Sequence, residues 1–193
     1  MKRLIFISLL CVPAVVWALY KPMRIISPAW VAGITCVSDV ICLDDVSRYQ
    51  EAVDLYGSAL HFVEARVGTI ESRPRVVFCS SQACFESFGF SQAAAHAVGV
   101  SGIVIGPRGW EEYDLRHEMI HHLQAERLGV YAQWRGPDWY IEGMAYYLSG
   151  DPRQYLNDPW GKYRSQFEHW YRAVGRDALW SEGKNTKVAV QPQ

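Results

Sequence analysis

The stretch DLRHEMIHHLQAERLG constrains the fold of this chain more than any other part of the sequence. Three of the six histidines stand beside one glutamate within it. Its pattern predicts a helix over residues 114–128, with Gly129 in the position that commonly ends a helix. On that helix His117 and His121 are four residues apart, so their imidazoles project from one face about one turn apart.

This spacing suits two nitrogen ligands on a single metal ion. Glu118 neighbours the same face and can reach a metal-bound water without ligating the metal. The arrangement is HExxH, whose chemistry is zinc-assisted hydrolysis. A catalytic zinc also needs a third protein ligand and an open position for water. Glu142 is the candidate, because it lies on the next expected helix, after a loop that can reverse the chain.

Residues near Glu142 support this interpretation. Gly143 and Ala145 are small, which would let their helix pack closely against the HExxH helix. Tyr146 lies four residues after Glu142 on the same face, so its hydroxyl can hydrogen-bond a ligand or the substrate. His122 is turned from the ligand face by about 100° and is expected at the surface or in support of a ligand.

RHEMIHHLQAERLG followed by PDWYIEGMAYYLSG resembles the gluzincin metallopeptidases, and most closely their small peptidase-MA-like members. These enzymes carry HExxH and then a glutamate ligand in a W-x-x-E-G-x-A context. The resemblance covers residues 114–150 and, more loosely, a strand at 100–106, which lines the substrate cleft in that family. It implies that His117, His121 and Glu142 bind one zinc ion per chain. It also implies that Glu118 is the catalytic base.

The N-terminus carries a 17-residue apolar run, Leu4 to Tyr20, preceded by Lys2 and Arg3. The run is longer than a typical signal-peptide core and short for a membrane-spanning helix. Residues 1–21 are therefore expected to be an uncleaved membrane anchor or a cleaved signal peptide, with a buried core segment as the remaining alternative. The first two interpretations place the domain on the periplasmic or extracellular side of the membrane, or make it secreted.

Apart from Cys11 in the apolar run, the cysteines form two closely spaced pairs: Cys36 with Cys42, and Cys79 with Cys84. An even number of cysteines outside the cytoplasm indicates disulfides, and four cysteines allow three connectivities. The local pairs are favoured. A four-cysteine zinc site is disfavoured, because neither pair has CxxC-type spacing.

The hydrophobic pattern predicts a single α+β domain with strands early and helices late. With the resemblance, the expected fold is zincin-like, in which a small sheet packs with the HExxH helix and a glutamate-bearing helix. The domain is expected over 22–180, with a flexible tail at 181–193. Expected elements are an extended segment at 22–43, a helix at 46–67, a strand at 74–80, a serine-capped short helix at 81–90, an edge strand at 97–109, and helices at 137–150 and 161–174.

The expected function is that of a membrane-anchored or secreted zinc metallopeptidase acting on a peptide or protein substrate. A strand ending in GIVIG can hold an extended peptide as an additional strand, which favours an endopeptidase. The net charge of −1 and the scattered basic residues disfavour a nucleic-acid partner. Two alternatives stay open: a catalytically silent zincin-like domain that binds or senses at the cell envelope, and a structural envelope protein without metal.

Overall fold

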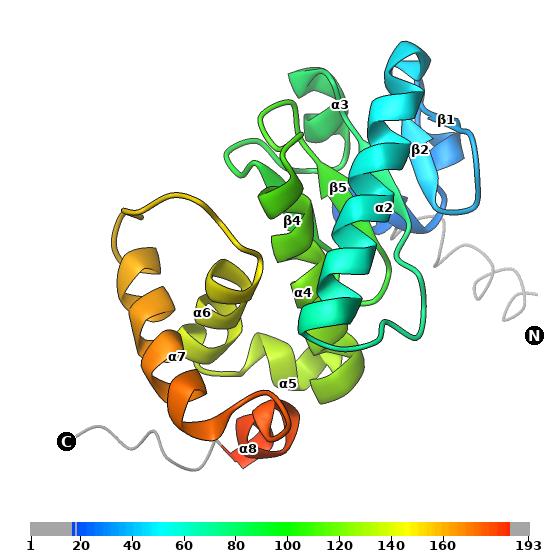
Figure 1. Ribbon diagram of the computed structural model, residues 1–193. Helices are drawn as coiled ribbons and strands as arrows, with labels where there is room; N and C mark the ends of the chain where they lie inside the picture. Colours follow the sequence, from blue (N-terminus) through cyan, green and yellow to red (C-terminus); the bar gives the residue numbers. More distant parts are fainter. Residues whose placement is uncertain (1–16, 18, 186–193) are drawn as a thin grey trace, which may run out of the picture.

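The computed structural model describes residues 17 and 19–185. Figure 1 shows a small sheet with α2 and α4 beside it, and a second group of helices formed by α5 to α8. The strands are β1 (Thr35–Cys36), β2 (Ile41–Leu43), β3 (Val76–Phe78), β4 (Ala95–Ala97) and β5 (Ile103–Ile105). The α-helices are α2 (Tyr49–Arg66), α3 (Gln82–Ser87), α4 (Glu112–Leu128), α5 (Val130–Trp134), α6 (Asp138–Leu148), α7 (Trp160–Val174) and α8 (Leu179–Asn185). Three short 3-10 helices are η1 (Lys21–Ile26), η2 (Pro28–Trp30) and η3 (Val46–Arg48).

Most of the expected anchor or signal peptide lies outside the described residues. Within the described part, no helix is long and apolar enough to cross a membrane. The expected tail also needs correction, because residues 181–185 belong to α8, where Gly183 is buried. Residues 186–193 lie outside the described part.

The sheet has the strand order β1-β2-β3-β5-β4. β2, β3 and β5 are parallel, and β1 and β4 are antiparallel to their neighbours. The expected edge strand is therefore wrong in part: residues 97–109 contain β5, which is internal and pairs with both β3 and β4. Three consecutive apolar residues, all buried, are typical of a strand covered on both faces. The edge is the preceding strand, β4.

Helix α4 extends close to its expected bounds, and Gly129 follows it with a φ of 85°, in the left-handed region that favours glycine. Its apolar face packs against α2 and the sheet. The buried residues on this face are Leu115, Met119, Ile120 and Leu123. Because this face is fixed in the core, the direction of His117 and His121 is fixed as well.

Helix α6 packs along α7 with very little space between the two backbones. A Cβ atom added at Gly143 would overlap the backbone carbonyl of Tyr163, so only glycine permits this approach. Phe167 of α7 is fully buried at the same contact. Four aromatic rings surround it at centroid distances of 5.6 to 6.0 Å: Tyr140, Tyr147, Trp170 and Tyr171.

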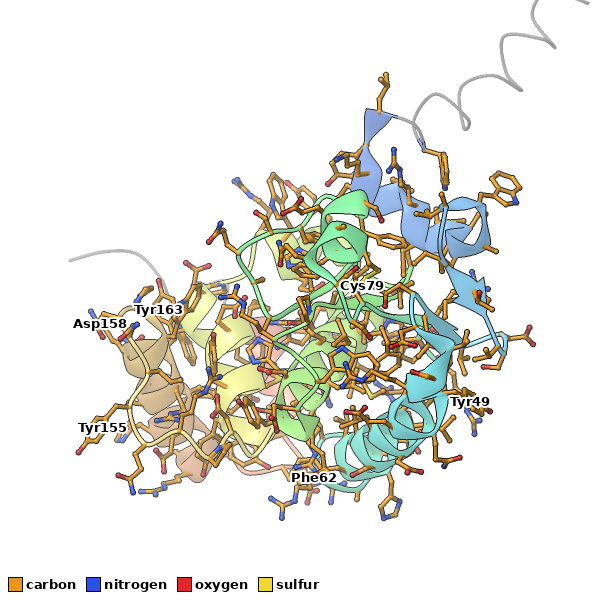
Figure 2. All side chains as sticks on the ribbon, turned by 90° about the horizontal axis from the view of Figure 1, so that it is seen from above. Tyr49, Phe62, Cys79, Tyr155, Asp158 and Tyr163 are labelled. Atoms are coloured by element: carbon orange, nitrogen blue, oxygen red, sulfur yellow. A yellow bond between two sulfur atoms is a disulfide. The ribbon has the colours of Figure 1, made fainter. Side chains whose placement is uncertain are left out.

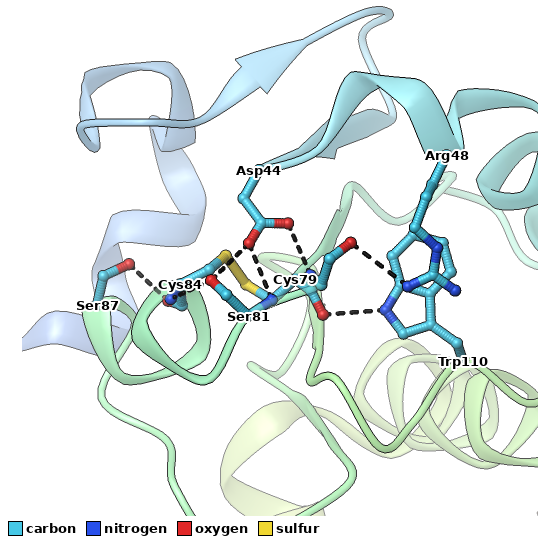
Figure 3. The surroundings of a disulfide bond; sticks show 8 residues. Asp44, Arg48, Cys79, Ser81, Cys84, Ser87 and Trp110 are labelled. Carbon is cyan, nitrogen blue, oxygen red and sulfur yellow. Dashed lines mark hydrogen bonds between the residues drawn. A yellow bond between two sulfur atoms is a disulfide. The ribbon is translucent and has the colours of Figure 1, made fainter.

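Both expected cysteine pairs form disulfides, Cys36–Cys42 between β1 and β2 and Cys79–Cys84 after β3. Figure 3 shows the second one and its surroundings. The Asp44 carboxylate accepts hydrogen bonds from the backbone N–H of Ser80 at 2.6 Å and of Ser81 at 3.0 Å. The Trp110 indole N–H donates to the Cys79 carbonyl at 2.9 Å. These contacts tie the carboxyl end of β3 to the segment after β2 and to the loop before α4.

Other elements differ from expectation in smaller ways. The segment after residue 21 was expected to be extended, but η1 and η2 occupy most of 21–30, and β1 and β2 follow. Pro22 and Pro28 stand at the first turns of these 3-10 helices, where proline needs no backbone N–H partner. Helix α5 was not expected; it is a single short turn between α4 and α6.

Candidate metal centre

His117 and His121 of α4 and Glu142 of α6 converge on one point. The Nε2 atoms of His117 and His121 are 3.0 Å apart. Glu142 places one carboxylate oxygen 3.6 Å from His117 Nε2 and the other 3.5 Å from His121 Nε2. Two ligand atoms bonded to one tetrahedral zinc ion are about 3.4 Å apart, given bonds of about 2.1 Å. The three side chains thus form a group that could hold a metal ion.

The Glu142 carboxylate favours a positive charge at this point. Burial lowers the pKa of His121, but the hydrogen bond and the negative charge of Glu142 outweigh it and raise the pKa to about 9. Burial raises the pKa of the Glu142 carboxyl, yet hydrogen bonds from His117 and His121 hold it well below its usual range. Glu142 is therefore ionised, and the positive charge that it requires can come from protons or from a bound metal ion.

Gln124 joins the two helices that carry the ligands, and the sequence analysis did not identify it. Its side chain is fully buried. The Gln124 Nε2 donates to the Ile141 carbonyl at 2.9 Å, and its Oε1 lies 2.8 Å from His121 Nδ1. With Nδ1–H donating to this oxygen, Nε2 of His121 carries the lone pair that a metal requires. The signal in the sequence was a polar residue three positions after a ligand on the same helix.

We expect Gln124→Leu to weaken metal binding by about 10- to 100-fold, because it removes the acceptor that fixes the His121 tautomer and ring direction. It also removes the donor to the Ile141 carbonyl on α6. Competition titration against a chromogenic chelator measures the metal dissociation constant. Gln50→Leu, at an exposed position of α2, is the matched control and should leave the constant unchanged. An unchanged constant for Gln124→Leu would contradict the positioning role.

Glu118 is nearly buried, with 8% of its surface exposed. Its Oε2 accepts a hydrogen bond of 2.6 Å from the backbone N–H of Ala97 in β4. The edge strand therefore orients this carboxylate through Oε2, and Oε1 takes no part in this contact. Its negative charge also contributes to the raised pKa of His121, which indicates that the two side chains are near one another.

Tyr146 of α6 lies beside His117. Its ring packs edge-on against the His117 imidazole, with centroids 4.5 Å apart. Burial, followed by the negative charge of Glu142, raises the pKa of Tyr146 to about 12. Its hydroxyl therefore keeps its proton at neutral pH and can donate a hydrogen bond.

His122 is not part of this group. It is fully buried, and its Nε2 lies 2.8 Å from the Ser72 carbonyl and 3.4 Å from Glu126. The contact with Ser72 fastens α4 to the segment before β3, so His122 has a packing position in the interior, away from His117 and His121.

A cavity of about 590 Å³ adjoins His121 and Glu142. β4 and the Val98–Gly99 turn form one wall, and α5 and the start of α6 form another. His121 and Glu142 are among its lining residues, so the convergence point can be reached from outside. Tyr20, Pro22, Val130 and Trp134 also line the cavity.

Comparison with protein-family models, curated proteins and solved structures gave no match to this chain.

Proposed function

We propose that this chain is a zinc-dependent metallopeptidase, with His117, His121 and Glu142 as the metal ligands. The observation that carries the proposal is the convergence of two imidazole nitrogens and one carboxylate beside an open cavity. Two histidines with one carboxylate, leaving a position for water, are the ligands of catalytic zinc in several hydrolases. The spacing of HExxH and the following glutamate supports the same family resemblance to gluzincins.

Zinc bound there would supply an acidified water and polarise the scissile carbonyl. Glu118 would take the proton from the attacking water and transfer it to the leaving amine. The hydrogen bond from Ala97 N–H holds one carboxylate oxygen of Glu118, which keeps the side chain in a fixed direction. Tyr146, protonated at neutral pH and in contact with His117, is the candidate donor to the developing oxyanion.

The edge strand supports an endopeptidase. Val98 N–H donates to Gly102 and Gly106 N–H donates to Ala94, which are contacts between the two ends of the β4–β5 pair. By the alternation of an antiparallel pair, the backbone groups of Ala95 and Ala97 point away from β5, and of these the Ala97 N–H donates to Glu118. A substrate can align as an extended strand beside the remaining groups, with its middle rather than its end near the ligands.

Two observations support a location outside the cytoplasm. The Cys36–Cys42 and Cys79–Cys84 disulfides persist most readily in an oxidising compartment. The apolar run Leu4–Tyr20 supports either attachment to the membrane or export. We therefore propose a periplasmic or extracellular domain that acts on peptides or proteins at the cell envelope.

The test is the metal content of the purified full chain. We expect about one zinc per chain, lost in His117→Ala and in Glu142→Ala, because each variant leaves only two protein ligands. His61→Ala, at an exposed position of α2, is the matched control and should keep its zinc. Elemental analysis after dialysis against zinc gives the stoichiometry. A parent chain without zinc after this treatment would refute the proposal.

A further inference from the structure

The N-terminal apolar run ends at the metal cavity. Tyr20, its last residue, and Pro22 line the same cavity as His121 and Glu142. The site is therefore next to the point where the apolar run joins the folded domain. This position of the site is given by the described residues and does not depend on whether His121 and Glu142 bind a metal ion.

No flexible linker separates the run from the domain. Lys21 Nζ donates to the Glu86 carbonyl at 3.2 Å, and Arg24 donates to the Ser87 carbonyl at 2.7 Å. The buried Ile25 packs in the hydrophobic core together with residues of β3 and α3. A linker of even ten residues would allow the domain to move about 30 Å from its attachment point. Here the attachment is part of the folded body.

Large apolar side chains stand exposed around the opening of the cavity. What we call the cavity mouth consists of three exposed lining residues, Tyr20, Val130 and Trp134, together with Tyr131, whose ring lies beside that of Trp134. Tyr131 and Trp134 are 73% and 74% exposed, and their ring centroids are 6.2 Å apart. Exposed neighbouring aromatic residues of this kind mark an interaction surface more often than ordinary solvent-facing surface.

The composition of this surface fits a bilayer interface. Tyrosine and tryptophan are enriched at the level of lipid head groups, where an apolar ring and a polar atom are both accommodated. Basic residues accompany them: Lys21 follows Tyr20 directly, and the Arg135 guanidinium lies 5.7 Å from the Trp134 ring centroid. Lysine and arginine beside an apolar segment interact favourably with anionic head groups.

We infer that the cavity mouth rests on the membrane surface, so that the metal site opens toward the lipid head groups. The occupant of this surface is the bilayer rather than a soluble protein, because the apolar run that would enter the bilayer emerges at the mouth itself. The segments that are cleaved would then lie at the membrane surface, a consequence that rests on the proposed peptidase function. Examples are the juxtamembrane part of a membrane protein and a membrane-bound peptide.

The test uses the full chain, with its apolar run retained, reconstituted into phosphatidylcholine and phosphatidylglycerol vesicles that contain brominated lipid. Bromine quenches tryptophan fluorescence at short range, so quenching reports contact with lipid. Trp134→Phe removes one of the eight tryptophans, at the cavity mouth. Tyr155→Trp adds one at a position that is 91% exposed. Figure 2 shows Tyr155 on the side of the molecule opposite the first described residues, so this added tryptophan is the matched control.

The difference in fluorescence between the parent chain and Trp134→Phe gives the signal of Trp134, and the difference for Tyr155→Trp gives the signal of the added tryptophan. We expect bromine to quench the signal of Trp134 at least about twice as strongly as that of the added tryptophan, as an interfacial aromatic residue requires. Equal or weaker quenching at Trp134 would overturn the inference and leave a soluble partner as the occupant of the mouth. Full chain that does not stay with the vesicles would overturn it as well. The His117→Ala chain should give the same quenching as the parent, so failure of the metal proposal and failure of this one are distinguishable.

Discussion

Glu118→Gln is expected to lower kcat for peptide hydrolysis by about 10²- to 10⁴-fold, the usual contribution of a general base. The substitution keeps the size of the side chain and an oxygen that can accept the Ala97 N–H, but it removes the basic site. Because Glu118 is not one of the three converging side chains, the zinc content should stay at that of the parent chain. Hydrolysis of a quenched fluorescent peptide library, followed by elemental analysis of the same preparation, measures both quantities.

Glu112→Gln is the matched control, since it makes the same chemical change at an exposed position of the same helix. It should retain activity within about twofold, as surface substitutions usually do. Full activity in Glu118→Gln would show that another group is the base. A parent chain that holds zinc and hydrolyses nothing would instead favour the alternative of a binding or sensing domain.

We expect Phe167→Ala to lower the free energy of unfolding by about 3 to 5 kcal/mol, the range for removing a buried phenylalanine ring. The ring is fully buried among four aromatic neighbours, and its loss leaves a cavity between α6 and α7 that the close contact at Gly143 prevents from collapsing. Since α6 carries Glu142, the metal site should lose affinity together with the loss of stability.

Denaturant unfolding followed by circular dichroism measures this change, with and without zinc. Tyr155→Ala is the control: its side chain lies almost entirely in solvent, so its effect should stay within about 0.5 kcal/mol. A change below about 1 kcal/mol for Phe167→Ala would show that the α6–α7 contact contributes little to folding, contrary to its burial.

The helices that carry the candidate site were predictable because their signals are local. The apolar positions of α4 recur at helical spacing, Gly129 ends the helix, and the four-residue step between His117 and His121 fixes their common face. The two disulfides were also predictable, because each pair is close in sequence and the short loop leaves few other partners. The convergence of Glu142 with the histidines depended on a loop whose path only the fold could reveal.

The strand at the edge of the sheet and the contacts of Gln124 could not be predicted from local sequence signals. Ile103–Ile105 and Ala95–Ala97 are both short, and strand order depends on pairing between distant segments rather than on either sequence alone. Gln124 looked like one polar residue on a helix of mixed character. Gln124 is important because its side chain donates to the backbone carbonyl of Ile141, and such a contact cannot be predicted from a pattern of side chains.

The position of the three converging side chains along the chain has a consequence for how the site is assembled. Glu142 follows His117 by only 25 positions, and Gln124 connects the same two helices. Bringing these residues together closes a short loop, for which the entropy cost is small, and contacts of short sequence separation form early in folding. These three side chains can thus meet while the C-terminal helices are still being synthesised. α7 then packs against α6, the helix that carries Glu142.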